Sequence, residues 1–400
     1  MPPVRARLPA GNGRGPREVR VQASDAGPAT APAVRLARTS APVAAAIGHM
    51  ESVEAYRGFL TATRGPDMGP MRLDLVDRLV RRLEPMPVCN LFVRSPTGEV
   101  ITATYVECFL VPDVEWTVAE AAQAVDRVKM AYRAAAQTGA RLVALGGFSS
   151  IVGESARLNP SLEYGIAFTT GNSLTAAVIA EQVLASLAGA RDATVTVVGA
   201  PGDVGSGVCR VLHARGLRLL LVGRRPEPLG ALAAELPGAE VRPWDEAAPA
   251  SDVVVLVSSA SLAGVSLDRV PPGALVLDAG HPANASPPSG AGPAYARAGR
   301  VRLHHPLESD LPEFLAYYRP GELHACLAEG MALALEKRWE PFSSGRGGIT
   351  PARTAEILAL AARHGIQPAP PIIQTARPEA EHAVRAIPPA RVASAAPAVE

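Results

Sequence analysis

Apolar residues recur along the chain at two spacings, one typical of strands and one typical of helices. Over residues 43–173 the two are mixed. Leu91–Val93 and Val100–Val106 flank a Ser-Pro-Thr-Gly turn, which predicts a β-hairpin. Apolar side chains three and four residues apart predict a helix over Ala119–Gln137, and a short apolar run predicts a strand over Leu142–Leu145. This part is therefore predicted to be a mixed α/β unit.

After a predicted helix over Leu174–Leu187, strands and helices alternate regularly. The predicted strands are Thr194–Val198, Leu217–Val222, Val253–Ser258 and Ala274–Asp278, and the helices between the first of them are Gly205–Ala214 and Leu229–Leu236. Such alternation implies a parallel sheet with helices on both faces. After about Val301 the pattern becomes helical, with main segments at Gly321–Trp339 and Pro351–His364. We therefore predict an α/β fold.

These patterns divide the chain into five segments. Residues 1–42, rich in Arg, Pro and Ala, are predicted to be a disordered leader, and residues 371–400 a disordered tail. Between them we expect a mixed α/β N-terminal domain over residues 43–173 and a Rossmann-type, doubly wound parallel-sheet domain over residues 174–300. Residues 301–370 are predicted to form C-terminal helices.

Composition narrows the functional classes. The net charge of +1 argues against a nucleic-acid partner. No apolar run reaches the roughly 20 residues of a membrane-spanning helix, and residues 1–42 lack the apolar core of a signal peptide. The cysteines lack the paired spacing of a zinc site or a disulfide scaffold, which favours a reducing cytoplasm. They are Cys89, Cys108, Cys209 and Cys326.

A glycine-rich loop follows the predicted strand Thr194–Val198 and precedes a helix. Its residues are Gly199, Ala200, Pro201, Gly202, Asp203, Val204 and Gly205. In this context the first glycine permits a tight turn, the second lets the backbone approach a pyrophosphate, and the third allows close helix packing. The helix N-terminus attracts the phosphates. The loop therefore predicts a bound dinucleotide.

The second predicted strand ends at Arg224 and Arg225, where an NAD enzyme usually carries an acidic residue. Two guanidinium groups there favour the 2′-phosphate of NADP, although a solvated surface pair is the alternative. Ser259 follows one later predicted strand and Asp278 ends another, and both are candidate cofactor contacts. Thr170 and Asn172 at the start of a predicted helix are candidates for the substrate and nicotinamide vicinity. Capping and turn formation explain each of these four equally well.

Considered alone, the cysteines and histidines give weaker signals. Cys209 falls inside a predicted helix and fits a small core residue. Cys326 falls early in another predicted helix, and residue chemistry alone still favours a structural role. His281, His304 and His305 could assist proton transfer, but loop or surface histidine is the more common outcome.

Several segments in order resemble the long-chain fatty-acyl-[acyl carrier protein] reductases. The resemblance covers about residues 46–368. The segments are Ile47–His49, Gly146–Ile151, Phe168–Asn172, the glycine loop, Ala325–Met331, Phe342–Arg346 and Ile349–Thr350. There are departures. His281 stands in a segment where the family tends to have Tyr, Ser309 replaces a His, and Ser344 replaces a Trp.

The resemblance implies a function. Cys326 would accept an acyl group from an acyl carrier protein or coenzyme A thioester, and NADPH would reduce that enzyme-bound thioester to a fatty aldehyde. Residues 43–173 would bind the substrate, residues 174–300 NADP, and no metal is required. A downstream aldehyde-consuming enzyme is a further expected partner.

Two other functions remain open from the sequence. One is a shikimate-dehydrogenase-like NADP oxidoreductase without a covalent step. It is disfavoured because Lys129 is the only lysine in the N-terminal domain and no Tyr-x-x-x-Lys occurs. The other is a noncatalytic NADPH-binding module, which would be indifferent to Cys326. The helix bearing Arg127, Lys129 and Arg133 could receive an acidic carrier protein, although a solvated face is the more ordinary explanation.

Overall fold

The computed structural model describes residues 41–64, 69–112, 116–190, 192–258, 265–290, 292–345 and 347–374. It also describes two short antiparallel strands, β1 (Ala6–Arg7) and β2 (Glu18–Val19). The predicted disordered leader and tail lie almost wholly outside these residues. Of the helices that the structure describes, none combines the length and the apolar character needed to cross a bilayer.

The N-terminal part is built on a mixed six-stranded sheet in the order β15-β4-β5-β3-β6-β7. Its strands are β3 (Ala44–Gly48), β4 (Met86–Arg94), β5 (Val100–Glu107), β6 (Leu142–Leu145), β7 (Ala167–Thr169) and β15 (Glu308–Ser309). Its helices are α1 (Val53–Arg64), α2 (Leu73–Val80), α3 (Val118–Gln137), α4 (Phe148–Ser155) and α5 (Pro160–Tyr164). The predicted hairpin is confirmed as β4 and β5, which pair antiparallel around a turn closed by a Gly98 to Ser95 hydrogen bond.

The second part is a seven-stranded sheet in the order β10-β9-β8-β11-β12-β13-β18. Its strands are β8 (Thr194–Val198), β9 (Arg218–Val222), β10 (Glu240–Val241), β11 (Val253–Leu256), β12 (Leu275–Asp278), β13 (Ala294–Arg297) and β18 (Ile373–Gln374). All neighbours are parallel except β18. In chain order the six parallel strands run 3-2-1-4-5-6, which is the Rossmann order. The predicted α/β, doubly wound class is confirmed.

Helices cover both faces of this sheet. They are α6 (Asn172–Leu187), α7 (Asp203–Ala214), α8 (Pro226–Glu235) and α9 (Trp244–Ala247), with short 3-10 turns at Ala248–Ala250 and Leu267–Arg269. The central strands β8 and β11 are buried at every residue, and apart from Thr194 and Thr196 they are apolar throughout, as is typical of parallel strands covered on both faces. Side chains of the two faces fall into separate clusters, one containing Val195 and Val197 and the other Val198 and Val254.

The prediction that residues 301–370 are helical was wrong for four short strands, one of which, β15, pairs with β4 in the N-terminal sheet. A three-stranded antiparallel sheet in the order β16-β14-β17 is formed by β14 (Arg300–Leu303), β16 (Glu322–His324) and β17 (Ile366–Pro368). The helices are α10 (Pro312–Leu315), α11 (Ala325–Leu335) and α12 (Pro351–Arg363). The predicted helix from Gly321 therefore begins only at Ala325. Pairing with distant strands overrides the local apolar spacing.

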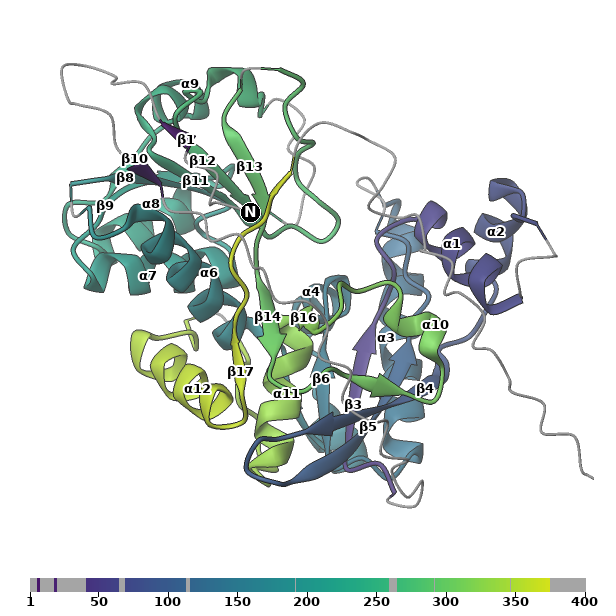
Figure 1. Cartoon of the computed structure of the whole chain (residues 1–400). Helices are drawn as coiled ribbons and strands as arrows, with labels where there is room; N and C mark the ends of the chain where they lie inside the picture. The colour runs from purple at the N-terminus through teal and green to yellow at the C-terminus, as the bar shows by residue number, and fades with distance from the viewer. Residues whose placement is uncertain are drawn as a thin grey trace, which may run out of the picture.

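The C-terminal segment joins the two large sheets (Figure 1). Its strand β15 returns to the N-terminal sheet beside β4, whereas β18 returns to the edge of the Rossmann sheet beside β13. Figure 1 shows β14, β16 and α11 between the two sheets. The first residues of α11 are thus held where both sheets can reach them.

Candidate active site

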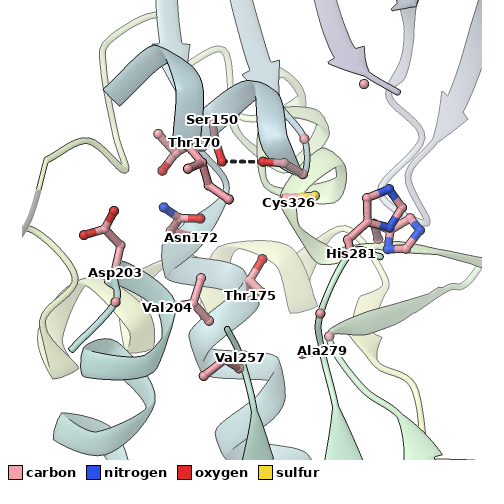
Figure 2. Close-up of a pocket in the computed structure, with 18 of the residues that line it drawn as sticks. Ser150, Thr170, Asn172, Thr175, Asp203, Val204, Val257, Ala279, His281 and Cys326 are labelled. Carbon is pink, nitrogen blue, oxygen red and sulfur yellow. Dashed lines mark hydrogen bonds between the residues drawn. The ribbon is translucent and has the colours of Figure 1, made fainter. Parts of the chain in front are cut away.

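A cavity of about 530 Å³ is lined by residues from both large sheets and from α11. Figure 2 shows Thr170, Asn172, Asp203 and Cys326 around this one space. The cavity lies at the carboxyl ends of β8, β11 and β12, next to the point where the strand order reverses. Ligands of doubly wound sheets bind at that place.

The glycine loop has the geometry that a dinucleotide requires. Gly199 has a φ of +90°, and a Cβ atom on it would lie 2.9 Å from the carbonyl carbon of Val257. A Cβ on Gly205 would collide with the carbonyl oxygen of Gly199, so the first turn of α7 packs directly on the loop. Gly202 is the N-cap, and no described side chain caps α7, which leaves its first amides available to an anion. The loop therefore fits a pyrophosphate.

The predicted cofactor residues divide into two groups. Those that line the cavity are Gly202, Asp203, Val204 and Arg225. Those that form the turn behind them are Gly199, Ala200 and Gly205. Arg224 follows β9 directly before Arg225, and both side chains are exposed. Ser259 lies outside the described residues.

Asp278 ends β12 as predicted, but its carboxylate is engaged within the protein. It is fully buried, and it accepts hydrogen bonds from the amides of Gly280 and Asn284 and from the hydroxyl of Tyr295 at 2.7–2.8 Å. Burial raises the pKa of Asp278, and Arg297 at 3.2 Å opposes that rise. These contacts shape the loop after β12, so Asp278 acts as a support behind the cavity.

Thr170 and Asn172 both line the cavity. The amide of Thr170 donates to the carbonyl of Ser343 at 2.9 Å, which fixes the backbone after β7. The Thr170 hydroxyl is buried and has no hydrogen-bond partner among the described residues. Because an unpaired buried hydroxyl is costly, this one is suited to a bound ligand.

Cys326 is the second residue of α11, and the chain packs closely around it. Gly171 (φ +72°) touches its backbone: a Cβ on Gly171 would lie 2.6 Å from the carbonyl carbon of Cys326. Burial raises the pKa of the Cys326 thiol to about 11, although the amides of Gly147 and Leu327 donate toward the sulfur and oppose the shift. The thiol is thus protonated at neutral pH until a ligand or a base changes its surroundings.

The other three cysteines have a different setting. All of them are buried, whereas Cys326 is partly exposed to the cavity. Burial raises the pKa of Cys89 and of Cys209 to about 12. The interpretation of Cys209 as a core residue is confirmed, because it is fully buried in the cluster on one face of the Rossmann sheet.

Comparison with known proteins identifies the family. No protein-family model matches the sequence. The long-chain acyl-[acyl-carrier-protein] reductase of Synechococcus elongatus is 33% identical over 339 residues, which cover 80% of this chain and 97% of that protein. The chain belongs to the long-chain acyl-[acyl-carrier-protein] reductase family.

Solved structures give only weak similarity. L-tryptophan dehydrogenase from Nostoc punctiforme is 14% identical, with 59% of this chain and 62% of that chain covered and a TM-score of 0.28. Glutamyl-tRNA reductase from Methanopyrus kandleri is 29% identical, with 41% and 43% covered and a TM-score of 0.22. Scores this low support no argument about this reductase-family chain.

His49 is a cavity residue whose role the sequence did not reveal. It follows the Ile-Gly pair of the segment that resembles the start of the family sequence. Its Nδ1 lies 3.0 Å from the carbonyl of Met50, and its Nε2 accepts from the amide of Phe148 at 2.8 Å. Burial, together with the nearby His281, lowers the pKa of His49 to about 3. This neutral ring fixes the Gly147 turn, where any Cβ would collide with it.

Glu329 also escaped the sequence analysis. It is fully buried one turn after Cys326, and its carboxylate accepts from the Thr169 hydroxyl and, at 2.7 Å, from the Leu174 amide. Burial raises its pKa, and these donors oppose the shift. Glu329 thereby ties α11 to the end of β7 and the start of α6. The sequence did contain a signal for Glu329, because a single Glu within a strongly apolar helix indicates a buried carboxylate with hydrogen-bond partners.

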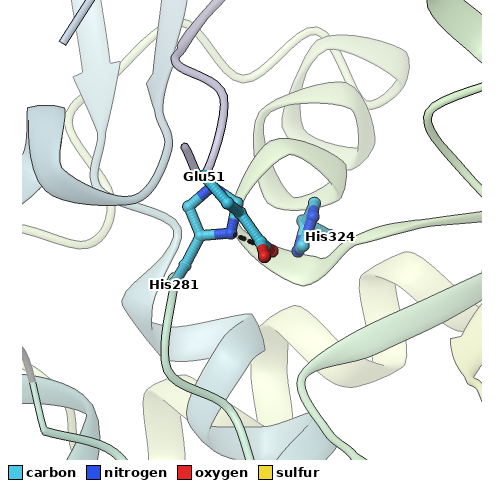
Figure 3. A group of neighbouring side chains, drawn as sticks. All are labelled: Glu51, His281 and His324. Atoms are coloured by element: carbon cyan, nitrogen blue, oxygen red, sulfur yellow. Dashed lines mark ion pairs between the residues drawn. The ribbon is translucent and has the colours of Figure 1, made fainter. Parts of the chain in front are cut away.

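Glu51, His281 and His324 form a cluster at the edge of the cavity (Figure 3). Each offers one possible ligand atom, and these atoms lie within 4.8 Å of one another. Glu51 Oε1, however, lies 2.8 Å from His281 Nδ1 and 3.5 Å from the Arg297 guanidinium. Because His281 and Arg297 already share this carboxylate, we interpret the cluster as a carboxylate that holds two side chains rather than as a metal site.

The two other candidate histidines lie elsewhere. His304 and His305 follow β14 and pack against each other, with ring centroids 4.6 Å apart. Within the described part of the chain, neither lines the cavity.

Proposed function

We propose that this chain reduces a fatty acyl thioester to a fatty aldehyde with NADPH, through a thioester on Cys326. One observation carries the proposal: Cys326 and the start of the glycine-loop helix line the same cavity. The relative from Synechococcus elongatus is named for reduction of long-chain acyl-[acyl-carrier-protein]. Family membership makes the same class of substrate the first choice here.

The first step would be transfer of the acyl group to the protein. The Cys326 sulfur attacks the carbonyl carbon, a new C–S bond forms, and the bond to the carrier sulfur breaks. The proton lost by Cys326 leaves on the carrier thiol. The amides of Gly147 and Leu327, already directed at the sulfur, are placed to stabilise negative charge during this step.

The second step would release the aldehyde. When bound, NADPH supplies a hydride to the carbonyl carbon of the acyl-cysteine. The Thr170 hydroxyl, which lacks a partner among the described residues, can donate a hydrogen bond inside the cavity. The resulting thiohemiacetal collapses: its C–S bond breaks, the aldehyde departs, and the Cys326 thiol is regenerated with one proton from solvent.

The basic residues of the loop after β9 indicate which nicotinamide cofactor binds and where. Arg225 lines the cavity and Arg224 precedes it, both with exposed guanidinium groups. These charges suit a 2′-phosphate, which supports NADPH over NADH. We place the cofactor in residues 174–300, the acyl substrate in residues 43–173, and the protein in the cytoplasm.

The carrier would be acyl carrier protein or coenzyme A, with a separate enzyme taking the aldehyde. Of the basic residues on α3, Arg127 donates to the backbone carbonyls of Leu83 and Arg81, so it is engaged structurally. Lys129 and Arg133 are exposed. These two are therefore the better candidates for contact with an acidic carrier protein.

Mass spectrometry tests the covalent step directly. Full-length protein is incubated with a palmitoyl thioester of acyl carrier protein in the absence of NADPH. We expect one added acyl mass, mapped to the peptide containing Cys326. Cys326→Ala should neither acylate nor form aldehyde, yet should bind NADPH with unchanged affinity. Cys209→Ala, which alters a buried thiol away from the cavity, is the matched control and should acylate normally.

The outcomes separate the rival functions. Full aldehyde production by Cys326→Ala would refute the covalent route and favour a direct-hydride oxidoreductase. NADPH binding without turnover of any acyl thioester would favour a noncatalytic binding module.

A further inference from the structure

The Cys326 thiol needs a proton acceptor, because burial keeps it protonated at neutral pH. Three described histidines line the cavity together with Cys326, and imidazole is the usual partner of a cysteine nucleophile. They are His49, His281 and His324. Their contacts differ enough to distinguish them.

Two of these histidines are poorly suited to accept a proton. Both ring nitrogens of His49 are in use, one at Met50 and one at the Phe148 amide, and protonation would break the second contact. His324 lies beside His281, with ring centroids 4.9 Å apart. Burial, and then the neighbouring His281, hold the pKa of His324 well below its usual range. Neither ring has a described carboxylate within hydrogen-bond distance.

His281 has the contacts that a proton carrier requires. Its Nδ1 lies 2.8 Å from Glu51 Oε1, the contact that Figure 3 marks with a dashed line. Burial would raise the pKa of Glu51, but His281 and Arg297 hold it well below its usual range, so this carboxylate stays charged. The other ring nitrogen, Nε2, has only a long 3.4 Å contact with the His49 carbonyl. A contact of that length is weak and easily exchanged.

His281 and Cys326 also share a wall of the cavity. A Cβ on Gly146 would lie 3.7 Å from the Cys326 sulfur, and a Cβ on the next residue, Gly147, would lie 2.8 Å from His281 Cδ2. The absence of side chains at this glycine pair thus allows Cys326 to approach Gly146 and His281 to approach Gly147. Figure 2 shows the Cys326 sulfur directed to the side on which His281 lies.

We propose that His281, oriented by Glu51, is the residue that accepts the Cys326 proton and returns it to the leaving thiol. The return of the proton to the leaving thiol rests on the proposed acyl transfer, whereas acceptance of the Cys326 proton does not. As the Cys326 sulfur bonds to the acyl carbon, its proton moves to His281 Nε2. When the bond from the acyl carbon to the carrier sulfur breaks, the same proton moves to that sulfur. Glu51 keeps its negative charge throughout and stabilises the intervening imidazolium.

Several charged and titratable groups surround His281 and Cys326. They are Glu51 and His49 after β3, Arg297 on β13, Tyr317 after α10, and His324 on β16. Arg297 repels an imidazolium, but its guanidinium is also held by Asp278 at 3.2 Å and by the Gly280 carbonyl at 2.5 Å. Among the described residues, Glu51 is therefore the carboxylate that contacts His281.

Alkylation of Cys326 by iodoacetamide tests, without any substrate, whether His281 accepts the Cys326 proton. The modification rate is followed by peptide mass spectrometry from pH 5 to pH 10. Wild-type protein should react at neutral pH, because His281 accepts the proton. In His281→Ala the rate at pH 7 should fall by about tenfold or more, and its rise should move to higher pH. Added imidazole should restore the rate of His281→Ala, and Glu51→Gln should show a smaller loss without such rescue.

His304→Ala is the matched control, since His304 is exposed and the described cavity does not include it. NADPH affinity, measured for every variant, shows that the fold is intact. Unchanged alkylation of His281→Ala across the pH range would overturn the proposal. So would one tightly bound metal per chain whose removal by a chelator increases the alkylation rate, because the cluster would then be a metal site.

Acylation by a palmitoyl thioester tests whether His281 also acts during transfer of the acyl group to Cys326. His281→Ala should acylate about 100-fold more slowly than wild type, which is within the range of general acid–base effects. A chain that shows the alkylation difference but accepts no acyl thioester would refute the proposed function and leave the His281 assignment for the thiol intact. A chain that acylates equally fast with and without His281 would refute the assignment and leave the proposed function intact.

Discussion

Replacement of Gly171 by alanine should displace Cys326 without altering any polar group of the site. Gly171 precedes α6 in the left-handed region, with a φ of +72°. A Cβ atom there would lie 2.6 Å from the carbonyl carbon of Cys326, and closer still to its Cα and carbonyl oxygen. All three are backbone atoms. The start of α11, or the loop before α6, must therefore move.

The expected loss in the free energy of unfolding is the sum of two contributions. A left-handed conformation costs an alanine about 1–2 kcal/mol. Overpacking against a backbone that must shift adds about 1–3 kcal/mol. Gly165 offers a matched control, because its φ is +67° and a Cβ on it would meet nothing within 4 Å. Gly165→Ala should therefore lose about 1–2 kcal/mol, and Gly171→Ala about 2–5 kcal/mol.

Urea unfolding at pH 7 gives the two stabilities, and iodoacetamide labelling of Cys326 reports its position. Gly171→Ala should be the less stable variant and should label at a changed rate, whereas Gly165→Ala should label like wild type. Equal stability losses in the two variants would contradict the close approach of Gly171 to Cys326. So would an unchanged labelling rate in Gly171→Ala.

Three further predictions address the cofactor, pH and the carrier. Arg224→Ala with Arg225→Ala should abolish any preference for NADPH over NADH, measured by fluorescence titration, and a retained preference would contradict the assignment. Burial raises the pKa of Glu107 from 4.5 to about 7, so its stabilising contribution is complete below about pH 4.5 and is lost as pH rises through 7. This amounts to about 3 kcal/mol, and Glu107→Gln should flatten stability, measured by urea unfolding, between pH 5 and pH 8. Lys129→Glu with Arg133→Glu should raise the apparent KM for a carrier-protein substrate more than for a coenzyme A thioester, and less so in high salt; an equal effect on both would exclude this face.

The sequence predicted the Rossmann sheet well because its signals are local. Each central strand is a short apolar run between helices, so Thr194–Val198 has the predicted bounds and α7 begins two residues before the prediction. The C-terminal strands are different. Glu322–His324 is adjacent to an apolar helix and pairs with Arg300–Arg302, some twenty residues earlier. Such a strand forms because a distant strand pairs with it, and its own sequence carries no strand signal. The apolar spacing of the adjacent helix therefore led to a predicted helix that included this strand.

The candidate site was predictable to the extent that single segments carry it. The glycine loop and the segment around Cys326 each contain their own signal, and both line the cavity. The Glu51–His281 contact does not. The sequence marked His281 as a candidate, but its partner Glu51 follows a strand of the other large sheet, about 230 residues earlier, and nothing local connects the two. The same holds for Glu329, whose partners Thr169 and Leu174 belong to another part of the chain.

Glycine marks the places where these distant segments meet. Gly147 leaves space for the His49 and His281 rings, Gly171 for the backbone of Cys326, and Gly205 for the Gly199 carbonyl. At Gly147 and Gly171 an added methyl group would fill the contact that places His281 or Cys326 beside the cavity, and at Gly205 it would fill the contact between α7 and the glycine loop. The sequence shows where such approaches occur but not what approaches, since a missing side chain is compatible with many partners. The chemistry of this site therefore depends on the packing of α11 against the N-terminal sheet and α6, which fixes the neighbours of Cys326.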